Sequence, residues 1–287
     1  MTIQQFTTTL AEGLLPAYDA AEAQTIAALV TETLLALTPL QRRLQAAQPV
    51  PAAVAERLPA LQARLQAHEP VQYVLGTAHF AGMELAVTSA TLIPRPETEE
   101  LAQLIAQANA RRPGLTVLDV GTGSGCLALA LAAALPAPAR VLAVDVSAEA
   151  LAVAARNAAR YAPGLELQQL DILREAPARL LPGTLDVLVS NPPYVRDSER
   201  PLMRENVLAW EPATALFVPD HDPLVFYRRL AALAAQLLRP GGQVWLEINE
   251  ALGPETAALF GPAEFAPVRV LPDFFGRVRF VQATRLG

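Results

Sequence analysis

The sequence predicts an α/β fold: a doubly wound, mostly parallel sheet, preceded by a small helical bundle and a β-hairpin linker. Three observations lead to this prediction. Short apolar runs alternate with helical stretches from about residue 115 onwards, a glycine-rich turn follows the first of these runs, and residues 1–72 show helical periodicity throughout. Strands that alternate with helices favour a parallel sheet with helices on both faces. A chain of 287 residues is long enough for more than one such unit.

The N-terminal region, residues 1–72, is predicted to be a helical domain. Residues 19–35 carry apolar side chains at three- and four-residue spacing, which is typical of an amphipathic helix. Residues 54–70 repeat the pattern, with Pro59 near the start and Pro70 just past the end. No glycine-rich loop or charged constellation lies here, so we expect this domain to recognise a substrate rather than perform chemistry.

Residues 73–94 are predicted to form a β-hairpin linker, because "YVLGTAHFAGMELAV" combines glycines with alternating apolar residues. The third domain, residues 95–287, begins with a helix. Prolines precede and open this helix, and Glu97, Glu99 and Glu100 lie in its first turn, where the helix dipole favours negative charge.

The remaining elements follow in alternation. The predicted strands are residues 115–121, 140–147, 165–173, 185–191 and 241–249, with two antiparallel edge strands within 268–285, and the predicted helices are 125–135, 148–161 and 222–238.

The composition of the chain argues against several classes of function. All 22 basic residues are Arg, and the net charge of −6 does not favour a protein that grips nucleic acid through its phosphates. No apolar run approaches the ~20 residues of a membrane span, and the N-terminus lacks the pattern of a secretory signal. A single cysteine, Cys126, fits a reducing compartment. We therefore expect a soluble, cytoplasmic protein.

No metal site is predicted. His68, His79 and His221 lack the spacing of metal ligands. Cys126 has no histidine near it in sequence and is expected to pack under the neighbouring loop.

The glycine-rich turn, "VLDVGTGSGC", predicts a cofactor site at residues Asp119, Gly121, Thr122, Gly123, Ser124 and Gly125. Glycines permit a tight turn and close approach of a ligand to the backbone. The spacing G-x-G-x-G, with an acid two residues before it, differs from the dinucleotide pattern G-x-G-x-x-G. It resembles motif I of the methyltransferases that use S-adenosylmethionine, and Asp119 would suit the cationic methionine end of that cofactor.

Two further carboxylates end predicted strands. Asp145 can accept both ribose hydroxyls of S-adenosylmethionine or of NAD, and Asp171 would lie near the adenine. The alternative for each is a helix cap or a turn residue.

The stretch "LVSNPPYVRD" follows the fourth strand and should share one crevice with the glycine-rich turn. Prolines have no N–H, so this loop offers acceptors: the side-chain oxygen of Asn191 and the main-chain oxygen of Pro192. Two acceptors match the two hydrogens of a planar –NH2 group, and Tyr194 supplies a ring for a flat substrate to stack on. Asn191, Pro192 and Tyr194 are therefore the predicted catalytic residues.

The predicted target is an amide or exocyclic amine nitrogen. The lone pair of such a nitrogen is delocalised, and acceptors that hold its hydrogens in place make it available to an electrophilic methyl group. No strong base is required, because the nitrogen becomes acidic once it is alkylated.

Further segments resemble one family, the protein-(glutamine-N5) methyltransferases of the PrmC/HemK type. These segments are "EPVQYVLG", "LIPRPETEEL", "EPATALF", "LRPGGQVWLEI" and "DFFGRVRFVQA", and the resemblance covers about residues 65–285. It implies a Rossmann-like fold that transfers methyl from S-adenosylmethionine to the glutamine of the Gly-Gly-Gln motif in class-1 peptide chain release factors. A monomer is expected.

The resemblance also implies roles for individual residues. Gly121 to Gly125, Asp145 and Asn191 would hold the cofactor, with Ile172 as an apolar wall. The substrate glutamine would lie against Asn191, Pro192, Pro193 and Tyr194, and the mouth would be closed by Arg95, Pro96, Glu97 and Thr98. The chain departs from the family at Ile172, where an aromatic residue is common, and at Asn249, where a glycine is usual.

Two alternatives remain at this stage. The "NPPY" motif also fits nucleic-acid methyltransferases that modify adenine N6 or cytosine N4, although the acidic balance and the lack of a target-recognition region argue against them. A non-catalytic module that binds S-adenosylmethionine is the second alternative.

Overall fold

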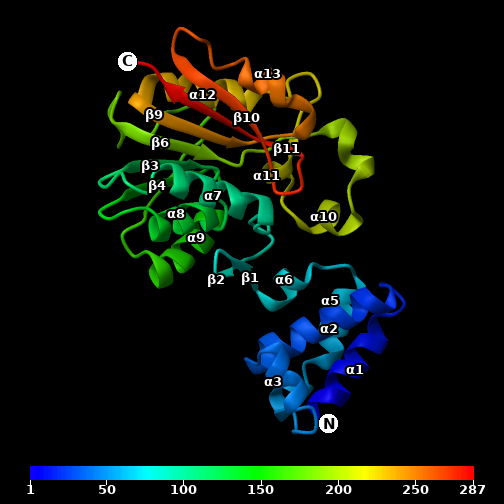
Figure 1. Ribbon diagram of the computed structural model, residues 1–287. Helices are drawn as coiled ribbons and strands as arrows, with labels where there is room; N and C mark the ends of the chain where they lie inside the picture. Colours follow the sequence, from blue (N-terminus) through cyan, green and yellow to red (C-terminus); the bar gives the residue numbers. More distant parts are fainter. The chain divides into compact units, whose positions relative to one another are not determined.

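The computed structural model describes residues 1–287 and divides into two compact units. The first comprises Met1–Thr77 together with Arg204–Trp210, and the second comprises Ala78–Met203 and Glu211–Gly287. The chain therefore passes between the units three times (Figure 1).

The regular secondary structure of the first unit is helical, apart from one isolated β-bridge and Thr77, where strand β1 Thr77–Phe80 begins. Its helices are α1 Ile3–Leu14, α2 Ala20–Leu35, α3 Pro39–Leu44, α4 Ala52–Ala55, α5 Leu58–Gln66, α6 Val71–Leu75 and α10 Glu205–Trp210. Thr2 and Asp19 cap α1 and α2 by accepting hydrogen bonds from backbone N–H groups. The apolar face of α1, with Phe6 and Leu10 fully buried, forms the core with α2 and α5. The Trp210 indole donates to the Ala67 carbonyl at 3.3 Å, which joins α10 to this unit.

The second unit is built on a seven-stranded sheet with the order β10-β11-β9-β6-β3-β4-β5. The strands are β3 Thr116–Val120, β4 Arg140–Asp145, β5 Glu166–Gln169, β6 Leu185–Ser190, β9 Leu238–Glu247, β10 Phe265–Pro272 and β11 Val278–Arg285. Strands β5, β4, β3, β6 and β9 are parallel, and β11 and β10 add antiparallel edges. The predicted doubly wound, mostly parallel sheet is confirmed.

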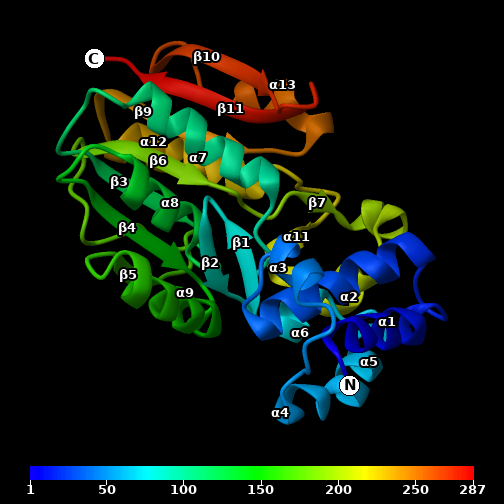
Figure 2. The same cartoon turned by 60° about the horizontal axis from the view of Figure 1, so that its bottom comes forward.

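Alternate residues of the central strands build two cores on opposite faces of the sheet. Val117 and Val187 pack with α7 Pro96–Ala108, α8 Cys126–Ala134 and α9 Ala148–Tyr161. Leu118 and Leu188 point the other way and pack with α12 Val225–Leu237, while α13 Gly253–Ala257 borders the same core. Figures 1 and 2 show the two helical layers on either side of the sheet.

The shorter elements complete the second unit. They are the hairpin β1 Thr77–Phe80 and β2 Met83–Ala86, the parallel pair β7 Val195–Arg196 and β8 Phe217–Val218, α11 Ala213–Leu216, and the 3-10 helices η1 Asp197–Leu202 and η2 Glu250–Leu252.

Two predicted boundaries differ from the structure. The hairpin was predicted from residue 73, but Tyr73 lies in α6, where Pro70 opens a short helix that Gly76 ends at a φ of +75°. The third predicted strand, 165–173, is β5 and ends at Gln169. The Leu170 N–H still donates to the Asp145 carbonyl of β4, and a turn follows in which the Asp171 side chain accepts a hydrogen bond from the Leu173 N–H.

Buried Asn157 of α9 ties the hairpin to the glycine-rich turn. Its Nδ2 donates to the carbonyls of Ala86 at 3.0 Å and Ser124 at 2.8 Å, and its Oδ1 accepts from the Ala86 N–H at 2.7 Å. One side chain thus fixes β2 and the end of the glycine-rich turn against the same helix.

We predict that Asn157→Ala destabilises the second unit by about 2–4 kcal/mol, because it leaves the buried Ser124 carbonyl and the partly buried backbone groups of Ala86 without partners. Urea unfolding followed by Trp245 fluorescence in a Trp210→Phe background measures this unit, since Trp245 belongs to it. The exposed neighbour Arg156→Ala should change stability by less than about 0.5 kcal/mol. Equal effects of both substitutions would contradict the prediction.

Candidate active site

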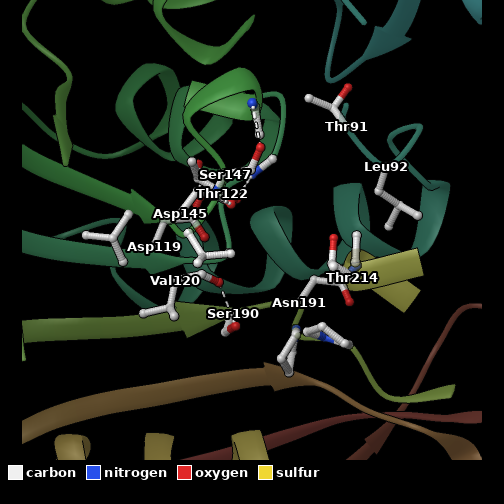
Figure 3. A pocket seen from close by; sticks show the side chains of 18 of the residues that line it. Thr91, Leu92, Asp119, Val120, Thr122, Asp145, Ser147, Ser190, Asn191 and Thr214 are labelled. Carbon is white, nitrogen blue, oxygen red and sulfur yellow. Dashed lines mark hydrogen bonds between the residues drawn. The ribbon is translucent and has the colours of Figure 1, made fainter. Parts of the chain in front are cut away.

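The two predicted motifs meet because β3 and β6 are adjacent and parallel, with Val120 opposite Ser190. The Ser190 hydroxyl donates to the Val120 carbonyl at 2.7 Å and joins the two strand ends. A cavity of about 390 Å³ opens beside them, within the usual range for small-molecule sites. Figure 3 shows Asp119, Asp145 and Thr122 gathered on one side of it and Asn191 apart from them near Thr214.

The cavity contains most of the predicted site residues. Those that line it are Arg95, Thr98, Asp119, Gly121, Thr122, Gly123, Ser124, Asp145, Asp171, Ile172, Asn191, Pro192 and Pro193.

The glycine-rich turn brings its backbone close to the second motif. Gly121 has a φ of +72°, and a Cβ built there would lie 4.0 Å from the Asn191 carbonyl oxygen. The N–H groups of Gly121 and Thr122 both donate to the Val144 carbonyl, at 2.9 and 3.1 Å. This anchors the turn to β4 and leaves its outer face to the cavity.

Asp145 ends β4 with its carboxylate held by two backbone N–H groups. Oδ2 accepts from Gly123 at 2.8 Å and Oδ1 accepts from Ser147 at 2.9 Å. A carboxylate has about four acceptor positions. Each oxygen therefore keeps capacity for a ligand hydroxyl, in a position that the backbone fixes.

Asp119 is a buried acid without a cation beside it. It is 1% exposed, and its Oδ2 accepts from the Thr122 hydroxyl at 2.7 Å. Burial, with a smaller contribution from the charge of Asp145, raises the pKa of Asp119 to about 7. The buried hydroxyl of Ser124, also in the cavity lining, has no hydrogen-bond partner. A ligand with cationic and polar groups would satisfy both.

Asp171 and Ile172 follow β5 and line the cavity from the sheet edge. Asp171 Oδ1 accepts from the Leu173 N–H at 3.0 Å, and Oδ2 pairs with Arg174 at 3.2 Å. Asp171 is thus both a turn residue and a cavity residue. Ile172 is 7% exposed and provides an apolar surface.

Asn191 is oriented by a hydrogen bond from its own amide group. Its Nδ2 donates to the Thr98 hydroxyl at 3.0 Å, and its Oδ1 accepts no hydrogen bond from the chain. Pro192 also lines the cavity, and its main-chain oxygen accepts none either. Neither of these two oxygens therefore has a hydrogen-bond donor within the protein, and their role as acceptors for a substrate stays a prediction.

Tyr194 lies elsewhere than predicted. Its ring packs against the core on the α12 side, it is absent from the cavity lining, and its hydroxyl donates to Glu247 Oε1 at 3.1 Å. The reason is the pairing of β7 with β8: the Tyr194 N–H donates to the Leu216 carbonyl, and this turns the ring inward. Burial raises the pKa of the Tyr194 hydroxyl above its ordinary value. The prediction of a free stacking ring is not met.

The segment at the start of α7 divides between two cavities. Arg95 and Thr98 line the main one, and Arg95 forms an ion pair with buried Glu211, which also accepts from the Ile93 N–H at 3.1 Å. Glu97, predicted with them, instead lines a second cavity with Phe274 and Phe275.

Sequence reasoning missed two buried acids. Glu211 accepts a hydrogen bond from Arg95. Glu247 is 1% exposed, and its carboxylate accepts hydrogen bonds from the hydroxyls of Thr98 and Tyr194. The signal for Glu247 was present, because a charged residue inside the apolar run "QVWLEI" is rarely buried without a partner.

Asn249, noted above as a departure, needs no left-handed backbone. Its φ is −64°, and its Nδ2 donates to the Tyr194 carbonyl at 3.1 Å and to Glu199 at 3.0 Å. Asn249 therefore stabilises the loop that carries Asn191 by a hydrogen bond to the Tyr194 carbonyl.

The structure has no group of three or more His, Cys, Asp or Glu side chains placed to hold a metal ion. None of its helices combines the length and apolarity needed to span a membrane.

Comparisons of the sequence with family models and with curated relatives agree on one family. Residues 97–210 match the model described as the methyltransferase small domain, and residues 8–76 match the PrmC N-terminal domain. A release factor glutamine methyltransferase of Bacteroides thetaiotaomicron is 42% identical over 225 residues, which cover 77% of this chain and 78% of the relative. One from Cereibacter sphaeroides is 41% identical over 251 residues, covering 87% and 86%. A solved methyltransferase structure from Pyrococcus furiosus has the same fold, with a TM-score of 0.51 and 21% identity over 79% of this chain and 98% of that one.

The raised pKa of Asp119 predicts how stability depends on pH. Its pKa is about 7 in the folded chain and near 4 when unfolded, so the folded state binds more protons between these values and stability falls as pH rises. Between pH 5.5 and 8 we expect a loss of ~2 kcal/mol from Asp119. Asp119→Asn should remove this part of the loss when the second unit is followed by Trp245 fluorescence. A stability difference between variant and parent that does not change with pH would contradict it.

Proposed function

The chain belongs to the release factor glutamine methyltransferases, and from this premise we propose how its cavity holds the methyl donor and the glutamine of a release factor side by side. The observation that carries the proposal is the pair of free acceptors, Asn191 Oδ1 and the Pro192 carbonyl, beside a pocket with a buried acid. These are the groups that a planar carboxamide –NH2 needs.

The enzyme uses S-adenosylmethionine, and the cavity fits this cofactor. We propose that Asp145 accepts the ribose hydroxyls with the acceptor positions that Gly123 and Ser147 leave free. Asp119 would face the cationic methionine end, which supplies the positive charge that its buried carboxylate lacks. Ile172 would contact the adenine ring and Asp171 its edge. The unpartnered Ser124 hydroxyl supports a polar ligand at the turn.

When bound, S-adenosylmethionine supplies a methyl group on a positively charged sulfur. The chain's task is to present the glutamine nitrogen. Asn191 Oδ1 and the Pro192 carbonyl would each accept one hydrogen of the –NH2 group, which fixes its plane and directs the nitrogen toward the methyl group. These two oxygens also stabilise positive charge that develops on the nitrogen during transfer. The nitrogen then loses a proton readily, so the site needs no strong base.

The two units suggest a division of labour. We propose that the helical domain, predicted as residues 1–72, contacts the body of a class-1 release factor while the Gly-Gly-Gln loop enters the cavity of the domain predicted as 95–287. One chain contains every group invoked for the reaction, so a monomer suffices. Release factors act on ribosomes, and this substrate implies a cytoplasmic enzyme.

Purified protein is expected to transfer radiolabelled methyl from S-adenosylmethionine to a release factor, and a Gln→Ala change in the Gly-Gly-Gln motif should abolish labelling. DNA and RNA in parallel reactions test the nucleic-acid alternative. Label in nucleic acid with none in the release factor would overturn the assignment. Cofactor binding without transfer to any of these substrates would instead favour the non-catalytic module.

Separate substitutions should distinguish the two halves of the cavity. Asn191→Ala is expected to lower kcat at least ~100-fold while leaving cofactor affinity within a few-fold, because it removes an acceptor for the substrate. Asp145→Ala should weaken cofactor binding measured by calorimetry, because two hydroxyls lose their acceptor. Full turnover by the first variant, or parental affinity in the second, would remove that residue from its proposed role.

A further inference from the structure

A series of two hydrogen bonds, one buried and one partly buried, connects Asn191 to a carboxylate that no part of the proposed reaction uses. Asn191 Nδ2 donates to Thr98 Oγ1 at 3.0 Å, and Thr98 Oγ1 donates to Glu247 Oε2 at 2.7 Å. Thr98 is 3% exposed and Glu247 is 1% exposed. This series of hydrogen bonds thus runs from the loop after β6, through α7, to the end of β9.

The ionisation state of Glu247 determines which group is the donor and which the acceptor in each of these hydrogen bonds. An ionised carboxylate can only accept, so the single hydroxyl hydrogen of Thr98 must point at Glu247. Thr98 then has only lone pairs to offer Asn191, and it can receive the amide –NH2 but not the amide oxygen. The oxygen of Asn191 is consequently left on the other side of the amide group.

A proton on Glu247 would permit the reverse order. A neutral carboxyl can donate to Thr98, whose hydroxyl hydrogen is then free to point at Asn191 Oδ1. The amide would turn over and present its –NH2 group to the cavity. Two –NH2 groups, one from Asn191 and one from the substrate, cannot hydrogen-bond through their donors, so substrate binding would lose an acceptor.

We propose that Glu247, acting through Thr98, fixes the amide of Asn191 with its oxygen toward the substrate, and that Thr98 and Glu247 are therefore positioning residues for the methyl acceptor. This inference rests on the proposed role of Asn191. It depends on which group donates in each hydrogen bond (the donor order), and this follows from the Asn191–Thr98 and Thr98–Glu247 distances and from the number of hydrogens that each group carries.

Other groups hold Glu247 in place and set its charge. Tyr194 donates to Oε1 at 3.1 Å, and the Tyr227 hydroxyl of α12 donates to the main-chain oxygen of Glu247 at 3.1 Å. Arg279 of β11 favours the ionised form, while the nearby charge of Glu97 on α7 opposes it.

Glu247 is the group of this cluster that titrates near neutrality. Burial raises its pKa to about 7. The pKa values of Tyr194, Tyr227, Arg279 and Cys126 are all raised, which keeps these groups protonated near neutral pH. Both amide orientations are therefore accessible to measurement between pH 6 and 8.

The first test is a set of isosteric substitutions assayed for methyl transfer at saturating cofactor. Thr98→Val removes the hydroxyl without changing the shape and should lower kcat at least about tenfold. Thr98→Ser keeps the hydroxyl and should stay within about threefold of the parent. Thr256→Val is the matched control, because Thr256 is also fully buried but its hydroxyl has no partner; its kcat should equal that of the parent.

The second test is the pH profile of kcat. In the parent, kcat should fall as pH decreases below about 7, since protonation of Glu247 releases the amide. In Glu247→Gln, which does not titrate, kcat should be lower at pH 8 and constant between pH 6 and 8. Saturating cofactor removes any contribution from the titration of Asp119 to binding.

The third test needs no activity. In protein labelled with ¹⁵N at asparagine side chains, the Asn191 –NH2 resonances, identified by their loss in Asn191→Ala, should shift with pH around a midpoint near 7. This shift should disappear in Glu247→Gln and in Thr98→Val. A parent without activity would refute the proposed function and leave this measurement to decide the donor order. A parent that is active, with Thr98→Val equal to it or with the same pH dependence in Glu247→Gln, would overturn the positioning role.

Discussion

Strands β3 and β6 lie side by side and run in the same direction, and this pairing creates the site. Asp119 stands opposite Val189 and Val120 opposite Ser190, so both chains leave the sheet at one level. The glycine-rich turn and the Asn191 loop can then approach so closely that a Cβ on Gly121 would lie 4.0 Å from the Asn191 carbonyl oxygen. Parallel strands leave at the same edge only because a helix returns the chain across the sheet. The functional residues thus depend on the fold for proximity and on local sequence only for chemistry.

Local sequence was sufficient where a residue's position follows from the end of a strand. Asp119, Asp145 and Asn191 all line the cavity, and their places follow from the sequence because apolar runs and glycine or proline turns mark where strands stop. Tyr194 could not be placed in this way. The direction of its ring depends on the pairing of Val195 with Phe217, two residues far apart in the chain whose contact no periodicity records.

The same limit explains why Glu247 escaped prediction. Its partners, Thr98 and Tyr194, are 149 and 53 positions away in sequence, so nothing local indicates what stabilises a carboxylate inside β9. Two acids near the cavity, Asp119 and Glu247, have pKa values of about 7, and both owe this mainly to burial. Ionisation of these two buried carboxylates therefore lowers the stability of the fold as the pH rises through neutrality. Perturbed pKa values of this kind are typical of functional sites, where stability is lower than the fold could reach.

The chain's three passages between the units have a consequence for how this protein can be divided or recombined. Residues Arg204–Trp210 lie between two segments of the sheet-containing unit but pack with the helices, and Pro212, two positions after Trp210, lines the cavity. A graft that exchanged only the first 77 residues with those of a relative would give this insert foreign neighbours. A chimaera that keeps these contacts therefore has to carry the helical unit and the 204–210 insert together.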